Sequence, residues 1–157
     1  MSRIRNEKLN AENLPTYAMV LPGLFLICSR SVIRLASEAI KDGKDVYVPK
    51  CVSKTEMLAV RIESTDDLAP GAYGIPEPVD CSETIGPDDI DLILVPCVSA
   101  WTDDRRLGHG AGYYDRFLKG NADKTLCLCF RKALSPDIPM DENDVLMRRV
   151  IFDPEQT

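Results

Sequence analysis

The chain has 157 residues, of which 45% are apolar and 28% are charged. This size and balance are typical of one globular domain with one hydrophobic core. The formal net charge is −6, so we do not expect the basic face that nucleic-acid binding requires. A local cluster of basic residues is still compatible with binding a phosphate.

Six cysteines occur in the sequence, an even number that is compatible with a disulfide framework. Their spacing contains no C-x-x-C pair and His109 is the single histidine, so reduced, packed thiols are favoured over a zinc site or disulfides. The first twenty residues contain no basic-then-apolar signal pattern. The longest apolar stretch, residues 18–28, is interrupted by Pro22 and Gly23 and is too short to span a bilayer. We expect a cytoplasmic protein with no membrane partner, and a monomer.

Residues 1–15 are polar without a helical stripe and predict a short N-terminal arm, followed by a single domain over residues 16–157. A first strand is expected within residues 17–28. A helix is predicted over residues 29–42, because apolar side chains recur there at helical spacing and Gly43 follows the last of them. Further strands are predicted at residues 45–49, 57–63, 91–98, 124–130 and 149–152.

The strand at residues 91–98 (DLILVPCV) is apolar on both faces, as strands inside a parallel sheet are. Residues 68–80 hold three prolines and two glycines and predict a structured loop. A second helix is expected to begin near Tyr113 and to reach Lys119. Strands that alternate with helices and are buried on both faces predict an α/β fold with a mostly parallel sheet.

The segment that carries chemistry runs from Arg105 to Asp115 (RRLGHGAGYYD), between the most apolar strand and the second helix. Ligands of open parallel sheets bind at the carboxyl ends of the strands, where this segment falls. Its three glycines permit positive φ angles, so that several backbone N–H groups can converge on an anion. The adjacent arginines carry donors that suit phosphate oxygens, and a carboxylate such as Asp115 is a ligand type that Mg²⁺ takes beside nucleotide phosphates.

A glycine spacing of this kind also occurs in ordinary tight turns, and taken alone it is weak support for a ligand site. The flanking arginine pair, the tyrosine pair and Asp115 favour the ligand site over the plain turn. The segment is not a Walker loop, because the chain contains no G-x-x-x-x-G-K-[ST] pattern.

The string RLGHGAGYYDRFL at residues 106–118 resembles the signature loop of the 5-formyltetrahydrofolate cyclo-ligase family, also called methenyltetrahydrofolate synthetases. Other strings that keep the order and approximate spacing of that family are VYVPK, VRIES, GIPEP, DLILVP and IPMDENDV. Together they cover roughly residues 17–152. The resemblance implies a three-layer α/β domain whose mostly parallel sheet is flanked by helices. It also implies an enzyme that converts 5-formyltetrahydrofolate to 5,10-methenyltetrahydrofolate with ATP and Mg²⁺.

The resemblance further implies which residues form the site. Those implied to bind ATP are Arg106, Leu107, Gly108, His109, Gly110, Ala111, Gly112, Tyr113 and Tyr114. Those implied to approach the folate are Met57, Tyr73, His109, Gly110, Ala111, Gly112 and Tyr113. Asp115 is implied to hold Mg²⁺. Arg106, His109 and Tyr113 are implied to be catalytic, with His109 either lining the ligand, which we favour, or acting as an acid–base group.

Departures from the family pattern leave an alternative open. The basic N-terminal helix of the family is reduced here to MSRIRNEK, Ser29 stands where the family has a carboxylate, and Arg148 stands where it has a late aspartate. The alternative is a degenerate member that binds nucleotide or folate with little or no catalysis. A third interpretation is an interaction domain without a ligand, which would show no ligand-dependent gain in thermal stability.

Overall fold

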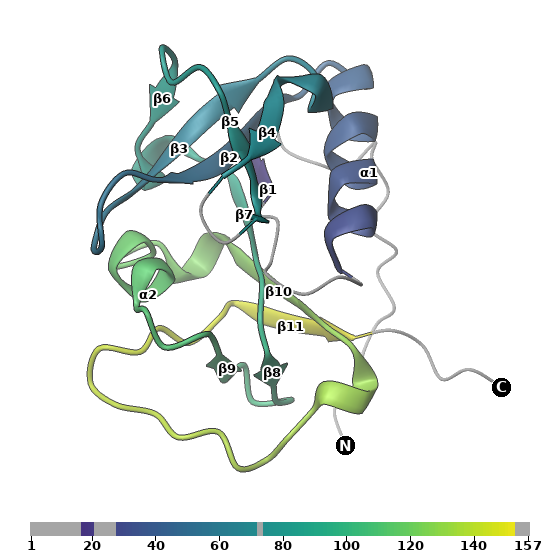
Figure 1. Cartoon of the computed structure of the whole chain (residues 1–157). Helices are drawn as coiled ribbons and strands as arrows, with labels where there is room; N and C mark the ends of the chain where they lie inside the picture. The colour runs from purple at the N-terminus through teal and green to yellow at the C-terminus, as the bar shows by residue number, and fades with distance from the viewer. Residues whose placement is uncertain (1–16, 21–27, 72–73, 153–157) are drawn as a thin grey trace, which may run out of the picture.

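The computed structural model describes residues 17–20, 28–71 and 74–152 of the chain. A seven-stranded sheet forms its centre, in the order β11-β10-β7-β1-β2-β3-β6 (Figure 1). Its strands are β1 (Tyr17–Val20), β2 (Asp45–Cys51), β3 (Met57–Ile62), β6 (Thr84–Ile85), β7 (Leu92–Val95), β10 (Thr125–Cys129) and β11 (Arg149–Phe152). Neighbours from β11 to β2 pair in parallel, whereas β3 pairs antiparallel with both β2 and β6. The predicted α/β fold with a mostly parallel sheet is confirmed.

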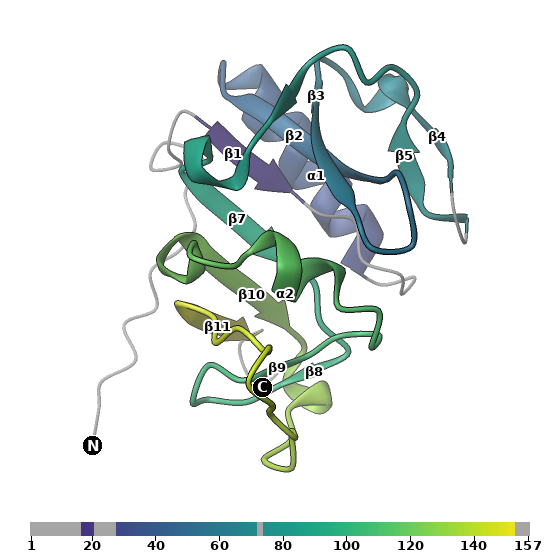
Figure 2. The same cartoon turned by 90° about the vertical axis from the view of Figure 1, so that its left-hand side faces the viewer.

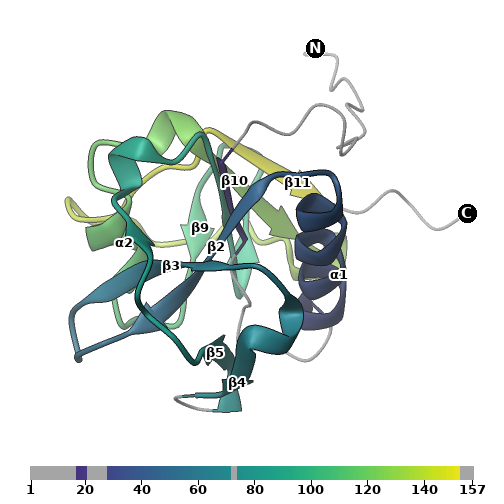
Figure 3. The ribbon, with the colours of Figure 1, turned by 90° about the horizontal axis from the view of Figure 1, so that it is seen from above.

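Two helices of unequal length cover the faces of this sheet. Helix α1 (Cys28–Lys41) has 14 residues and packs on one face, and α2 (Tyr113–Phe117), with 5 residues, lies on the opposite face (Figure 3). The buried cluster under α1 consists of Ala36, Ala39, Val46, Val48, Ile62, Leu92 and Leu94. The expected three layers with flanking helices are met only in part, because helices are few and loops make up much of the layer around α2. No helix within the described ranges is long and apolar enough to cross a membrane.

Helix α1 ends at Lys41, two residues before Gly43, as the position of this glycine predicted. Gly43 has φ +73°, and its N–H donates to the carbonyl oxygen of Ile40 at 3.0 Å, while the N–H of Lys44 donates to that of Ala39 at 3.0 Å. These bonds satisfy carbonyl groups that the end of a helix would otherwise leave without partners.

Several other boundaries differ from the prediction for local reasons. Strand β7 ends at Val95, because Pro96 has no N–H to donate and the following residues form a separate hairpin. That hairpin pairs β8 (Ser99–Ala100) with β9 (Arg106–Leu107). The proline-rich residues 68–80, predicted as a loop, contain a second hairpin of β4 (Leu68–Pro70) and β5 (Pro76–Pro78). One-turn 3-10 helices occur at Thr65–Asp67, Pro87–Asp89, Ala122–Lys124 and Arg131–Ala133.

The chain adds strands on one side of β1 first, beginning with β2, and later on the other side, beginning with β7. The order of the strands therefore reverses at β1. Strands β1, β7 and β10 run side by side, with α2 in front of the sheet and α1 behind it (Figure 2). In open α/β sheets the ligand crevice lies outside the carboxyl ends of the strands, at the point where the order reverses. The chain after β7 and the turn after β2 both leave the sheet at this edge.

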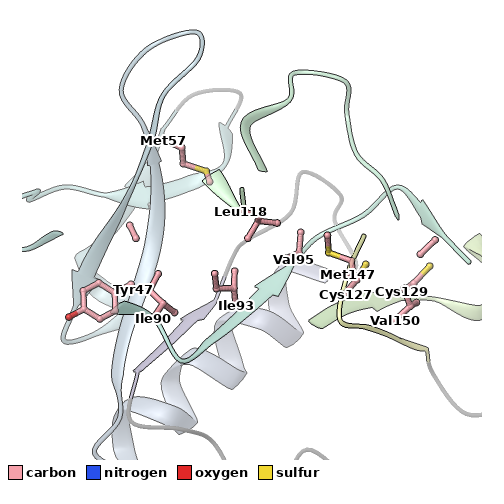
Figure 4. Packing of buried hydrophobic residues seen from close by; sticks show 12 residues of the cluster. Tyr47, Met57, Ile90, Ile93, Val95, Leu118, Cys127, Cys129, Met147 and Val150 are labelled. Atoms are coloured by element: carbon pink, nitrogen blue, oxygen red, sulfur yellow. The ribbon is translucent and has the colours of Figure 1, made fainter. Parts of the chain in front are cut away.

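A second buried cluster fills the face under α2 (Figure 4). Its members include Met57, Ile93, Val95, Leu118 and Cys127. Leu118, directly after α2, is fully buried, and partly buried aromatic rings of α2 pack against the same cluster. A helix of one turn has little stability of its own, so this burial holds α2 in place.

The turn between β8 and β9 is connected to β11 by Asp104. Within the described ranges it is the one non-glycine residue with a positive φ, +70°. Its Oδ1 accepts a hydrogen bond from the N–H of Val150 at 3.0 Å, and its carbonyl oxygen accepts one from the N–H of Met147 at 3.0 Å. Aspartate tolerates this left-handed conformation better than most residues. Asp104 therefore fixes the chain that leads into the glycine loop against the last strand.

Replacing Asp104 with alanine is expected to lower the free energy of unfolding by about 2–3 kcal/mol, because the N–H of Val150 loses its acceptor and alanine disfavours the positive φ. Asp104→Asn keeps an acceptor oxygen and should lose less than about 1 kcal/mol. Urea unfolding followed by circular dichroism measures both losses. Equal losses for the two variants would contradict the role given to the side-chain oxygen.

Candidate functional site

The glycine loop, residues 108–112, lies between β9 and α2 at the carboxyl edge of the sheet. Gly110 and Gly112 have φ angles of +81° and +66°, which residues with a Cβ rarely adopt. In the described part of the chain, no hydrogen bond is donated by the backbone N–H of Gly108, Gly110, Ala111 or Gly112. A run of N–H groups without protein acceptors, on backbone of alternating handedness, suits an anion.

A buried guanidinium lies directly beneath this loop. The side chain of Arg106 is 3% exposed. Its Nη1 donates to the carbonyl oxygen of Pro96 at 3.2 Å, and its Nη2 donates to both carboxylate oxygens of Asp115 at 3.3 Å. The guanidinium also lies 5.5 Å from the centre of the Tyr114 ring. A buried charge is stable only when it is paired and hydrogen-bonded in this way.

Gly108 makes room for that guanidinium. A Cβ on Gly108 would lie 2.8 Å from Nη1 of Arg106, so the absence of a side chain is required by close approach rather than by a positive φ. The Nε of Arg106 is buried and has no hydrogen-bond partner among the described atoms. An unsatisfied buried donor is unfavourable, and the described residues supply no acceptor for it.

Asp115 connects the loop to the segment before β11. Besides pairing with Arg106, its Oδ1 accepts a hydrogen bond from the N–H of Val145 at 3.3 Å. Asp144, the residue before Val145, accepts the N–H of Asp141 through its own carboxylate at 2.7 Å. Two carboxylate-bearing segments thus meet at one place, a juxtaposition that the sequence does not reveal because Asp115 and Val145 are 30 residues apart.

The two tyrosines of α2 have different environments. The hydroxyl of Tyr113 donates to the carbonyl oxygen of Ser53, in the turn after β2, at 2.7 Å. The hydroxyl of Tyr114 is desolvated, and this burial raises its pKa although the charge of Arg106 acts in the opposite direction. Tyr114 therefore stays neutral over the physiological range and acts through its ring, against Arg106.

The remaining predicted site residues include exposed loop residues, one buried residue and one residue outside the described ranges. Leu107, His109 and Ala111 are exposed on and beside the glycine loop. Met57 is 7% exposed and belongs to the buried cluster under α2. Tyr73 lies outside the described residues. The structure thus brings the residues of the predicted ATP loop together at one edge, with Met57 packed below them.

Arg105 does not offer its donors to the loop. Its Nη1 and Nη2 donate to the carbonyl oxygens of Ile138 and Pro136 at 2.7 and 2.9 Å, and its Nε pairs with Asp103 at 2.8 Å. The expectation that both arginines of the pair serve a phosphate is therefore replaced by a division of roles. Arg105 fixes the segment at residues 136–138, and Arg106 lies under the loop.

A free thiol lies beside Arg106 at the end of β7. Cys97 donates from Sγ to the carbonyl oxygen of Leu128 at 3.4 Å. Its pKa is raised to about 12, chiefly by hydrogen bonding with the Cys127 thiol and also by burial, whereas the Cys129 thiol and the Arg106 charge oppose this shift. A thiol with such a pKa is not a thiolate near neutral pH and therefore packs rather than reacts.

The residues present fit a nucleotide phosphate with its metal. Among the residues that the structure describes, no group of three or more His, Cys, Asp or Glu side chains is placed to hold a metal ion by itself. Mg²⁺ commonly takes only one or two carboxylates and fills its other positions with phosphate oxygens and water. Asp115 is adjacent to the glycine loop and accepts a hydrogen bond from the residue after Asp144, and it matches that kind of site.

Comparison with known proteins shows the family of the chain. The residues matched by the 5-formyltetrahydrofolate cyclo-ligase family are 29–153. The chain belongs to this family. The prediction made from the glycine loop and its flanking strings is thereby confirmed.

Three relatives show how far the family match extends. The probable 5-formyltetrahydrofolate cyclo-ligase of Schizosaccharomyces pombe is 35% identical over 127 residues, which cover 70% of this chain and 62% of that protein. The probable enzyme of Caenorhabditis elegans is 34% identical over 137 residues, covering 77% and 66%. The cyclo-ligase of Mus musculus is 28% identical over 132 residues, covering 76% and 65%. The chain therefore spans less than two thirds of the length of each of these relatives.

Solved structures support the fold. The NMR structure of 5,10-methenyltetrahydrofolate synthetase from Aquifex aeolicus superposes with a TM-score of 0.71 at 29% identity, covering 87% of this chain and 68% of that one. The synthetase from Mycoplasma pneumoniae superposes with a TM-score of 0.58 at 21% identity, covering 87% and 72%. At the latter identity the likeness concerns the fold alone.

Gly108→Ala is expected to lower the free energy of unfolding by about 1–3 kcal/mol, because the added Cβ displaces the Arg106 guanidinium from its partners. Gly110→Ala is the matched control. A Cβ at Gly110 meets nothing within 4 Å, so only the unfavourable φ, about 1 kcal/mol, is expected to act.

A double-mutant cycle with Arg106→Met separates the clash with the guanidinium from the effect of an unfavourable φ angle. In that background the loss from Gly108→Ala should shrink, since the clash partner is gone, while the loss from Gly110→Ala should stay the same. Denaturant unfolding of the single and double variants measures the coupling. Zero coupling between positions 106 and 108 would overturn the proposed reason for the glycine.

Proposed function

We propose that this chain catalyses the ATP-dependent conversion of 5-formyltetrahydrofolate to 5,10-methenyltetrahydrofolate. The observation that carries the proposal is the buried Arg106 guanidinium next to a loop in which four backbone N–H groups have no acceptor in the described part of the chain, at the carboxyl edge of the sheet in a member of the cyclo-ligase family. The names of its relatives from Schizosaccharomyces pombe and Mus musculus state a cyclo-ligase activity for those proteins. We further propose that the protein acts as a cytoplasmic monomer.

The chemistry explains why such a site is needed. The formyl oxygen is a poor leaving group, so the second folate nitrogen cannot displace it directly. ATP supplies a phosphoryl group to that oxygen, which then leaves as phosphate when the nitrogen bonds to the formyl carbon. Phosphoryl transfer depends on positioning and charge neutralisation more than on a strong base. A loop of N–H donors over a fixed guanidinium provides both.

Each residue of the loop then has a role in the proposal. The N–H groups of Gly108, Gly110, Ala111 and Gly112 bind phosphate oxygens, and Arg106 neutralises their charge from below. Leu107 and Tyr114 hold Arg106 and the loop in register. Tyr113 and His109 line the space where nucleotide and folate meet.

Tyr113 is proposed to act by position rather than as an acid, because its hydroxyl proton is donated to the carbonyl oxygen of Ser53. Met57 supports the folate side from within the core, and Tyr73 is proposed to lie against the pterin ring. Aromatic stacking of this kind contributes about 1–3 kcal/mol in other ligand systems.

Asp115 is proposed to hold Mg²⁺ together with the nucleotide phosphates. Bound there, Mg²⁺ would neutralise part of the phosphate charge during transfer. The carboxylate is already oriented by Arg106 Nη2 and the N–H of Val145, so it needs no large rearrangement to receive a metal. Pairing with Arg106 lowers the charge that the site presents before ligands arrive, which reduces the penalty of a half-buried carboxylate.

A second candidate function is a family member that binds nucleotide or folate with little turnover. One observation favours it. Arg148, which stands where the family has an aspartate, is exposed, and within the described residues its hydrogen bond is the one that its backbone N–H donates to Oγ1 of Thr125 at 2.9 Å.

The deciding experiment mixes the full chain with MgATP and 5-formyltetrahydrofolate and follows the absorbance of methenyltetrahydrofolate. An absorbance rise supports the enzyme. Thermal stabilisation by MgATP or folate without a rise supports the binding-only relative, since a ligand at 100 times its Kd stabilises by about 2.7 kcal/mol. Absence of both responses would reject both functions.

Asp115→Asn should weaken MgATP binding by about 1–3 kcal/mol, because the amide cannot act as an anionic metal ligand. The fold should persist, since the amide oxygen can still accept the N–H of Val145. Calorimetry of MgATP binding measures the loss, with the exposed Asp123→Asn as a charge-matched control. Unchanged affinity in a folded Asp115→Asn protein would remove Asp115 from the site.

A further inference from the structure

A second arginine contacts the glycine loop at the end opposite to Gly108, where Arg106 contacts it. Arg116, in α2, donates from Nη2 to the carbonyl oxygen of Ala111 at 2.9 Å. Its Nε donates to the carbonyl oxygen of Thr55, in the turn after β2, also at 2.9 Å. Its guanidinium lies 5.4 Å from the centre of the Tyr113 ring. Arg116 thus joins the glycine loop, α2 and the β2–β3 turn.

The same guanidinium fills the space over Gly112. A Cβ on Gly112 would lie 2.7 Å from Nη1 of Arg116, and Gly112 has φ +66°. The positive φ favours glycine here, and a Cβ would in addition displace the end of the exposed Arg116 side chain from its present position. Tyr113 fixes the turn that carries Thr55, the second acceptor of Arg116. The hydroxyl of Tyr113 donates to the carbonyl oxygen of Ser53, two residues before Thr55, at 2.7 Å.

The contact with Ala111 determines where a backbone donor points. In a planar trans peptide the C=O of one residue and the N–H of the next point in opposite directions. The guanidinium that holds the carbonyl of Ala111 therefore turns the N–H of Gly112 away from itself. That N–H is one of the loop donors that carry no protein acceptor in the described part of the chain.

We infer that Arg116 is a positioning residue, which holds the glycine loop in the conformation that receives phosphate and orients the N–H of Gly112 for it. The inference rests on the proposed function for the identity of the anion. Arg116 does not itself touch the phosphates; it acts through the Ala111–Gly112 peptide. Nothing in the sequence connects Arg116 with Thr55, which lies 61 residues earlier.

An exposed side chain such as Arg116 contributes little to global stability, because its hydrogen bonds compete with water. The expected consequence of its loss is therefore local. Glycine-rich backbone is the most flexible kind, so a loop without its carbonyl tie should sample many conformations. The nucleotide would then have to order the loop as it binds, which weakens its apparent affinity.

Three variants test this inference. Arg116→Met keeps the aliphatic stem but removes every polar contact. Arg116→Lys keeps the charge but lacks the fork that reaches two carbonyl oxygens at once. Lys119→Met is the matched control, because it removes one positive charge from an exposed residue just beyond α2.

The first measurement needs no ligand and so does not depend on the proposed function. Backbone ¹⁵N relaxation of the whole chain gives order parameters for the amides of Gly110, Ala111 and Gly112. We expect them to fall in Arg116→Met and Arg116→Lys and to match the wild type in Lys119→Met, with melting temperatures within about 2 °C of one another. Unchanged loop order in Arg116→Met would overturn the inference, whatever the nucleotide does.

The second measurement is calorimetry with MgATP alone. We expect roughly tenfold weaker binding for Arg116→Met and Arg116→Lys, and wild-type affinity for Lys119→Met. Wild-type affinity in Arg116→Lys would mean that charge alone matters and would overturn the positioning role. If the wild-type chain binds no MgATP while the loop is loosened by Arg116→Met, the proposed function fails and the role of Arg116 in ordering the loop stands.

Discussion

The pairing of the Arg106 guanidinium with Asp115 and the carbonyl of Pro96 is the interaction on which the site depends. A cation that is 3% exposed is stable only while its partners stay in place. Those partners come from the end of β7 and from α2, and Asp115 also accepts the N–H of Val145 ahead of β11. One buried charge thus forces three segments to meet at the carboxyl edge of the sheet.

Two of the loop glycines leave space for arginine side chains as well as exposing backbone N–H groups to a ligand. Gly108 gives space to Arg106, and Gly112 gives space to Arg116. Gly110 meets no side chain, and only its positive φ requires glycine. One guanidinium thus contacts each end of the loop, and the N–H groups of Gly108, Gly110, Ala111 and Gly112 have no acceptor in the described part of the chain. The described residues include no cluster of acidic or histidine side chains that could hold a metal by itself, so backbone N–H groups, arginines and Asp115 are the groups that this candidate site offers to a ligand.

Much of this could be predicted from the chain itself, where a local pattern decides the outcome. Alternating and continuous apolar runs marked the strands within a few residues, and Gly43 marked the end of α1. The loop string RLGHGAGYYDRFL indicated both the family and the place of the site. The prediction was less successful for residues 68–80, where prolines suggested a loop. Their pairing in a β4–β5 hairpin depends on backbone contacts that no local pattern shows.

The sequence by itself determined the α/β class and the family and indicated the candidate ligand loop, because these depend on periodicity and on a contiguous string. Only the tertiary structure decided what the charged residues of that string do. Arg105 and Arg106 are neighbours in sequence, yet one donates to the carbonyls of residues 136 and 138 and the other lies under the loop. Their partners, like Thr55 for Arg116, are brought in by strand order and by burial of α2. Contacts between residues far apart in the chain leave no periodicity in a single sequence, so the fold alone distinguishes the arginine that supports the site from the one that braces its surroundings.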